Sequence, residues 1–101
     1  MVQRLKNWIG GEWLDASSDR TEPVYNPATE ELLAHVPLSA KEDVERAANS
    51  AKEAFRTWSR TPVPKRARIL FKYQQLLVDH WEELAGFITR ENGKSYNEAH
   101  G

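Results

Sequence analysis

Three residue types that can carry chemistry stand together near the end of the chain, in the run Gly93-Lys94-Ser95. A phosphate-binding loop closes with the same residues, because its lysine and backbone N–H groups hold phosphate oxygens. That loop also needs a strand before it and a glycine five positions before Gly93, where this chain has Ile88. We therefore interpret Gly93 as the residue that ends a helix, a position where glycine is enriched.

Other candidate catalytic groups lack partners in the sequence. No two of His35, His80 and His100 have the spacing that places two imidazoles on one helical face. Ser17 and Ser18 lie in a polar segment without an identifiable base, so a serine nucleophile has no support. The chain contains no cysteine, which excludes disulfides and thiolate metal sites. We expect no catalytic, cofactor-binding or metal-binding residue here.

Composition and charge exclude several classes of protein. Of the 101 residues, 40% are hydrophobic and 29% are charged, which is typical of a folded domain. The net charge of −1 provides no field that would attract nucleic acid. No apolar run approaches the roughly 20 residues that cross a bilayer, and the start lacks the apolar stretch of a signal peptide. We expect a cytoplasmic protein that binds neither nucleic acid nor membrane.

One basic cluster, Lys65-Arg66-Ala67-Arg68, stands where we expect a helix to begin. The helix dipole disfavours positive charge at that end. Two interpretations stay open, a solvated face and a docking site for acidic groups outside this chain.

The first third of the chain is predicted to form strands and turns. Residues 5–9 and 12–16 are expected to pair around Gly10-Gly11, because primed hairpin turns require positive φ angles. That register places Trp8 opposite Trp13.

A second pair of extended segments follows. Residues 23–25 and residues 31–36 are predicted strands, separated by a turn at Asn26-Pro27. Strands and turns therefore occupy residues 1–38.

The hydrophobic period becomes helical at Ser39, which forms a possible capping box with Glu42. We expect the first helix to stop near residues 61–64, and we expect Pro64 to be the first residue of the second helix.

Asp79 and Glu82 form a second possible capping box, which predicts a break near His80 and a third helix over residues 81–92. Ser95 with Glu98 predicts the start of a fourth helix in residues 93–101.

The aromatic side chains repeat at strand and helix spacing, so we expect most of them to pack in a core. They are Trp8, Trp13, Phe55, Trp58, Phe71, Trp81 and Phe87. Three amphipathic helices and a hairpin carry more apolar surface than so short a chain can bury, so we expect a partner to cover some of the apolar faces. The expected class is α+β, with a hairpin and short strands followed by two or three amphipathic helices. Residues 1–101 are expected to form part of one domain.

Several segments resemble the N-terminal region of aldehyde dehydrogenases. They are LKNWIGGEW at 5–13, NPATEELLAHVPLS at 26–39, AFRTWS at 54–59, VPKRARILFKYQQLL at 63–77 and ITRENGKSYNEA at 88–99. The stretch RARILFKYQQLL is most similar to the methylmalonate-semialdehyde (malonate-semialdehyde) dehydrogenase group. The resemblance covers essentially the whole chain.

The resemblance implies a larger α/β fold with an NAD-binding domain, a catalytic domain and a strand arm that joins subunits. It also implies a reaction in which a cysteine thiolate attacks an aldehyde, hydride passes to NAD, and the acyl group is transferred to coenzyme A. The family's cysteine, glutamate, asparagine and NAD-binding loops have no counterpart in residues 1–101. NAD and coenzyme A are therefore expected for a full-length enzyme and not for this chain alone.

Two hypotheses remain. In the first, the chain is the N-terminal fragment of an NAD-dependent, CoA-acylating semialdehyde dehydrogenase, inactive alone, whose partners are the remainder of the enzyme and the other subunits of a homo-oligomer. In the second, it is a stand-alone helical interaction module derived from a dehydrogenase N-terminus.

Overall fold

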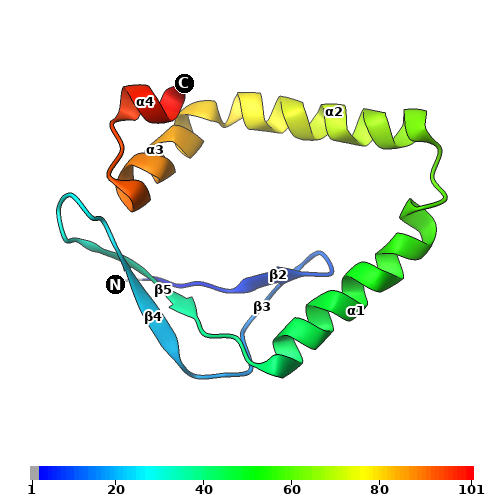
Figure 1. The fold of residues 1–101 in the computed structure, drawn as a ribbon, viewed down its shortest axis with the longest axis horizontal. Helices are drawn as coiled ribbons and strands as arrows, with labels where there is room; N and C mark the ends of the chain where they lie inside the picture. Colours follow the sequence, from blue (N-terminus) through cyan, green and yellow to red (C-terminus); the bar gives the residue numbers. More distant parts are fainter. Residues whose placement is uncertain (1–2) are drawn as a thin grey trace. The chain divides into compact units, whose positions relative to one another are not determined.

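The computed structural model describes residues 3–101, which combine short strands with helices (Figure 1). Five strands come first and four helices follow: β1 Gln3–Arg4, β2 Asn7–Ile9, β3 Glu12–Leu14, β4 Thr21–Tyr25, β5 Leu32–Pro37, α1 Lys41–Trp58, α2 Val63–Asp79, α3 Trp81–Asn92 and α4 Tyr96–His100. The predicted mixture of strands and helices is confirmed.

The elements form two compact units. The strand unit comprises the described residues through Tyr25 together with residues 32–60, and so contains all five strands and α1. The helix unit comprises residues 26–31 and 61–101, and so contains α2, α3 and α4.

The predicted hairpin is present in the strand unit as β2 and β3. Trp8 pairs with Trp13 and Ile9 with Glu12, as the Gly10-Gly11 turn predicts. The φ angles of Gly10 and Gly11 are 61° and 81°, the left-handed values that a two-residue primed turn needs. The two indole rings meet edge to face with centroids 4.9 Å apart.

A three-stranded sheet with the order β1-β5-β4 completes the strands. β4 pairs antiparallel with β5, and β1 pairs parallel with β5, in which the Leu5 N–H donates to the His35 carbonyl at 2.9 Å. The prediction of one strand over residues 5–9 is wrong, because the chain leaves the β1–β5 pairing after Leu5 and joins β3 at Asn7. One extended segment thus serves two sheets.

Helix α1 begins two residues later than Ser39, so the predicted Ser39–Glu42 capping box is wrong. The N-cap residue is Ala40, which has no side-chain acceptor, and its N–H donates to Asp43 Oδ2 at 2.8 Å. Asp43 therefore supplies the acidic half of a capping box, displaced by one residue from the prediction. Ser39 instead accepts a hydrogen bond from Asn7 Nδ2 at 2.9 Å.

In the helix unit, α2 begins at Val63, so Pro64 is the second helical residue and not the first. The break near His80 is confirmed, because α2 ends at Asp79 and α3 begins at Trp81. The Asp79–Glu82 capping box is wrong, since Asp79 Oδ1 accepts a hydrogen bond from Gln75 Nε2 at 2.9 Å and α3 has no side-chain cap.

The end of α3 and the start of α4 agree with prediction. Gly93 has φ 80° and its N–H donates to the Thr89 carbonyl at 3.0 Å, which closes α3. Ser95 Oγ accepts from the Glu98 N–H at 3.3 Å and caps α4. The turn at Asn26 is also confirmed, because its side-chain oxygen accepts from the Ala28 N–H at 2.9 Å.

The expected aromatic core is absent from the described residues. Within residues 3–101, Ala85 is the only buried hydrophobic residue, at 2% exposure, while Trp13 and Phe71 are 66% and 67% exposed. The other five aromatic residues assigned to a core are exposed as well: Trp8, Phe55, Trp58, Trp81 and Phe87. The helical period correctly identified apolar faces, but these elements do not cover them. Among the same residues no helix has the length and apolar character needed to cross a membrane.

Candidate functional site

The most connected polar group of the strand unit is the carboxylate of Asp43, which is 3% exposed. Its Oδ1 and Oδ2 accept from the Ser17 N–H at 3.0 and 3.1 Å, and Oδ2 also accepts from Ser17 Oγ at 2.9 Å. With the bond from the Ala40 N–H, these donors surround the carboxylate. They tie the segment after β3 to the first turn of α1.

These donors favour the ionised form of Asp43. The Ala40 N–H lowers the pKa of the Asp43 carboxyl most, and the Ser17 N–H, the Ser17 hydroxyl and the nearby Arg46 lower it further, while burial acts in the opposite direction. A carboxylate whose pKa is lowered and whose oxygens are occupied by donors is a poor general base. The hydrogen bonds around Asp43 therefore have a structural role.

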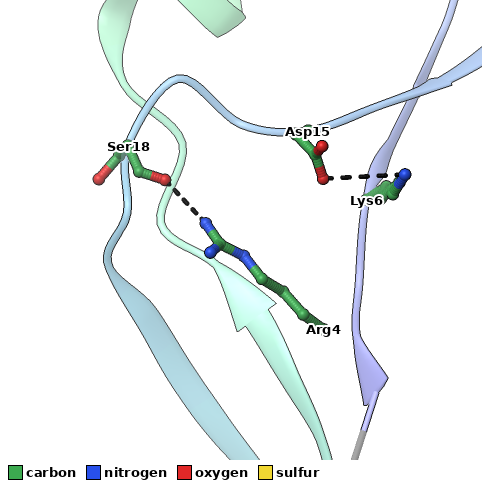
Figure 2. A network of polar contacts seen from close by, with 4 residues as sticks. All are labelled: Arg4, Lys6, Asp15 and Ser18. Carbon is green, nitrogen blue, oxygen red and sulfur yellow. Dashed lines mark hydrogen bonds and ion pairs between the residues drawn. The ribbon is translucent and has the colours of Figure 1, made fainter.

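Ser17 and Ser18, the serines considered as nucleophiles, are both engaged in loop contacts. Ser17 donates to Asp43, as above. Ser18 Oγ accepts from the Arg20 N–H at 3.1 Å, and the Ser18 carbonyl accepts from Arg4 Nη2 at 3.0 Å (Figure 2). These bonds engage both serines in contacts of the loop.

The structure brings two of the three histidines to one hollow, which the sequence did not predict. His80 and His100 line a hollow of about 450 Å³ together with residues 78, 79 and 81–83. His80 Nδ1 lies 3.0 Å from Glu83 Oε2, and the His100 ring lies beside the rings of Trp81 and Tyr96. Across residues 3–101 no three His, Asp or Glu side chains are placed to hold a metal ion. His35 belongs to β5 of the strand unit and is not among the residues that line this hollow.

The run Gly93-Lys94-Ser95 connects two helices and does not follow a strand. Gly93 is required there for two reasons. Its φ of 80° is left-handed, and a Cβ added to it would lie 3.1 Å from Pro27 Cγ. This geometry differs from a phosphate-binding loop, in which a strand leads into the loop and a helix follows it.

The basic cluster also lies in the helix unit, in the first turns of α2. Lys65 and Arg68 are exposed, and Arg66 is half-buried with an Nε that has no hydrogen-bond partner within the described residues. Two of the three basic side chains of the cluster are therefore solvated.

Sequence reasoning missed Asp43, although a signal was present. An acidic residue at the third position of a helix commonly accepts from the N-cap N–H, and Asp43 lies three residues after Ala40. The contact with Ser17 joins residues 26 positions apart. No local pattern reports such a contact.

Comparison with known proteins identifies relatives of this chain. Residues 13–101 match the model of the aldehyde dehydrogenase family. A malonate-semialdehyde dehydrogenase from Geobacillus thermodenitrificans is 69% identical over 100 residues, covering 99% of this chain and 21% of its own length. The corresponding Bacillus pumilus protein is 67% identical, with the same coverage of both chains.

Solved structures agree with the sequence comparisons. A structure described as a methylmalonate-semialdehyde dehydrogenase from Sinorhizobium meliloti, complexed with NAD, superposes with a TM-score of 0.94 at 38% identity. It covers 100% of this chain and 21% of its own. The chain thus spans about a fifth of the length of the relatives it matches. On the family match and these identities, the chain belongs to the aldehyde dehydrogenase family.

Proposed function

We propose that this chain is the N-terminal segment of an NAD-dependent, CoA-acylating malonate- or methylmalonate-semialdehyde dehydrogenase, and that its role there is structural. The observation that carries the proposal is the 69% identity over nearly the whole chain to a malonate-semialdehyde dehydrogenase five times as long. The substrate and the transfer to coenzyme A follow from the names of such relatives and from the family resemblance.

The apolar surface supports a structural role. Helix α2 exposes Leu70, Phe71 and Val78, whose spacing places them on one side of the helix, and it exposes Ile69 and Leu76 on another side. Folded monomers rarely expose large contiguous apolar patches, and such patches mark surfaces that another polypeptide covers. The remainder of the dehydrogenase is the proposed cover for α2.

The residues described here do not fit an NAD site. A dinucleotide fold binds the pyrophosphate at a glycine-rich turn between a parallel strand and a helix. Gly10-Gly11 instead join two antiparallel strands, and Gly93 joins two helices. We therefore assign NAD and coenzyme A to the remainder of the enzyme, and no reaction step to this chain. Cytoplasmic location and assembly with further subunits belong to the same proposal and rest on the family alone.

A complementation experiment tests the proposal. The chain would be mixed with the part of the Bacillus pumilus relative that it does not match, and NADH would be followed with malonate semialdehyde, NAD and coenzyme A. We expect neither part alone to be active and the mixture to form NADH. A remainder that is fully active without this chain would contradict the proposed role.

Two matched variants connect the activity to the apolar face. Phe71→Asp places a charge on the exposed apolar surface of α2, and Lys72→Asp places the same charge at the neighbouring polar position. We expect Phe71→Asp to abolish complementation and Lys72→Asp to retain most of it, because burying an unpaired carboxylate costs several kcal/mol. Equal loss in both variants would point to charge alone. A monomeric, cooperatively folded chain that fails to bind the remainder would support the interaction-module hypothesis instead.

A further inference from the structure

The two edges of the β1-β5-β4 sheet differ in what they offer to another strand. On one edge, Pro23 in the middle of β4 has no N–H to donate, and proline on an edge strand blocks pairing. Pro23 lies opposite His35 in the β4–β5 pairing. The His35 carbonyl accepts from the N–H of Leu5, the residue after β1, so the main-chain groups of His35 face β1 and not β4. The main chain of Pro23 therefore faces outward, at a position that has no N–H. The β4 edge is thereby closed to a further strand.

The β1 edge has no such block. In a parallel pair, alternate residues of a strand bond to the same neighbour. Because the Leu5 N–H bonds to β5, the N–H and C=O of Arg4 face away from the sheet. Residues 3–6 are all exposed, and with Trp13 they line a hollow of about 490 Å³. An extended segment therefore has both main-chain partners and space along this edge.

The basic side chains of this edge, Arg4 and Lys6, each contact the loop between β3 and β4 (Figure 2). Arg4 Nη2 donates to the Ser18 carbonyl at 3.0 Å, and Lys6 Nζ lies 3.9 Å from Asp15 Oδ1. Charged side chains on an edge strand normally discourage pairing. Here both side chains contact the loop, and both remain exposed basic groups that line the hollow.

We propose that the outer edge of β1 accepts an acidic, extended polypeptide segment as an additional strand. Main-chain hydrogen bonds to Arg4 would provide the pairing, and acidic side chains at alternate positions would face Arg4 and Lys6. An apolar side chain between them would lie against Leu5 and Trp13 in the hollow. A second copy of this chain is disfavoured as the occupant, because two antiparallel β1 edges would bring the basic residues of both copies together. This inference is independent of the dehydrogenase proposal.

The test uses the 101-residue chain, alone where it is monomeric and otherwise in the mixture with the unmatched part of the Bacillus pumilus relative, and two synthetic peptides, one alternating glutamate with valine and one alternating lysine with valine. Amide hydrogen exchange by NMR would be read at Arg4, with the Leu5 amide as the internal reference for an intact β1–β5 pairing. We expect the glutamate peptide to slow exchange at Arg4 about tenfold and the lysine peptide to leave it unchanged.

Two variants at one position separate main-chain pairing from charge. Arg4→Pro removes the outward N–H and leaves the Leu5 bond, whereas Arg4→Ala removes only the side chain. We expect the affinity for the glutamate peptide to fall about tenfold in Arg4→Pro and less in Arg4→Ala.

Several results would overturn the inference. The first is equal protection of the Arg4 amide by both peptides. The second is an unchanged affinity of Arg4→Pro for the glutamate peptide while the Leu5 amide stays protected. The third is an Arg4 amide that becomes protected as the protein concentration rises in the absence of peptide. An unprotected Leu5 amide in the unmodified chain would overturn it too, since the β1 edge would then not exist. None of these results bears on whether the mixture with the remainder forms NADH.

Discussion

The strand unit and the helix unit are held together by different means. Among residues 3–101, the strand unit has one buried charged residue, Asp43, whose contact with Ser17 joins segments distant in the sequence. The helix unit has one buried apolar residue, Ala85, and a glycine that the chain geometry requires at Gly93. Neither has an apolar core among the described residues. The comparison shows that buried hydrogen bonds stabilise one unit and that a left-handed glycine shapes the other, and that both units expose their apolar faces.

The largest effect is expected when Asp43 is changed. Asp43→Ala leaves the N–H groups of Ser17 and Ala40 and the Ser17 hydroxyl without an acceptor in a buried place, which is more costly than losing an exposed bond. Exchange of the Ser17 amide should accelerate at least about tenfold, while the Gly93 amide in the other unit should not change. Asp43→Asn, which keeps one acceptor oxygen, should give an intermediate rate. Unchanged exchange at Ser17 would refute the polar-anchor account.

The same carboxylate predicts a pH dependence confined to the strand unit. Because the folded-state pKa of Asp43 lies below its usual value of 3.8, ionised Asp43 stabilises the fold fully above about pH 4, and this stabilisation is lost as pH falls through the lowered pKa. Hydrogen exchange at Ser17 between about pH 5 and pH 3, corrected for intrinsic rates, should show this loss. Asp43→Asn should lack it, and an equal pH response in that variant would assign the effect to other carboxylates.

Two glycines of the helix unit, Gly93 and Gly86, test whether its stability depends on backbone conformation. Gly93→Ala forces a side chain into a φ of 80° and places Cβ 3.1 Å from Pro27 Cγ, so it should destabilise the helix unit by about 1 to 2 kcal/mol. Gly86→Ala is the matched control, because it lies inside α3 with open space around its Cβ and should stabilise by about 0.5 to 1 kcal/mol. Denaturant unfolding would measure both, on the complex with the remainder if the chain alone has no cooperative transition. Two changes of the same sign would contradict the assigned roles.

The smallest predicted effect concerns the aromatic pair of the hairpin. A double-mutant cycle with Trp8→Ala and Trp13→Ala should give a coupling energy of about 0.5 to 1 kcal/mol, because the rings meet edge to face at 4.9 Å. The cycle Trp8→Ala with Phe55→Ala, two exposed residues with no ring contact between them, is the control and should show no coupling. A coupling near zero in both cycles would show that the Gly10-Gly11 turn alone sets the register.

The hairpin turn and the end of α3 were predictable from the sequence because their causes are local. Gly10-Gly11 fixed the hairpin register and Gly93 fixed the end of α3, each through the φ angle that only glycine adopts easily. The sequence predicts the N-cap of α1 one residue early, because Ser39–Glu42 and Ala40–Asp43 both have the spacing of a capping box. The tertiary contacts of Ser39 with Asn7 and of Asp43 with Ser17 favour the second pair.

Burial could not be predicted in the same way. The helical period shows which face of α2 is apolar, but it does not show which polypeptide covers that face. Phe71 was therefore assigned to a core and is 67% exposed. The shared hollow of His80 and His100 was also missed, because it depends on how α4 returns to Trp81 through the bond from Trp81 Nε1 to the His100 carbonyl at 2.7 Å.

The central claim is that the apolar faces of this chain are covered by the remainder of a dehydrogenase. The most direct test is near-UV circular dichroism of the four tryptophans, with size-exclusion chromatography, on the chain alone and mixed with the unmatched part of the Bacillus pumilus relative. For the chain alone, the account predicts a weak near-UV signal or aggregation. For the mixture, it predicts a single species whose near-UV signal exceeds the sum of the signals of the two parts. A monomeric chain with a full aromatic signal that the remainder does not change would contradict it.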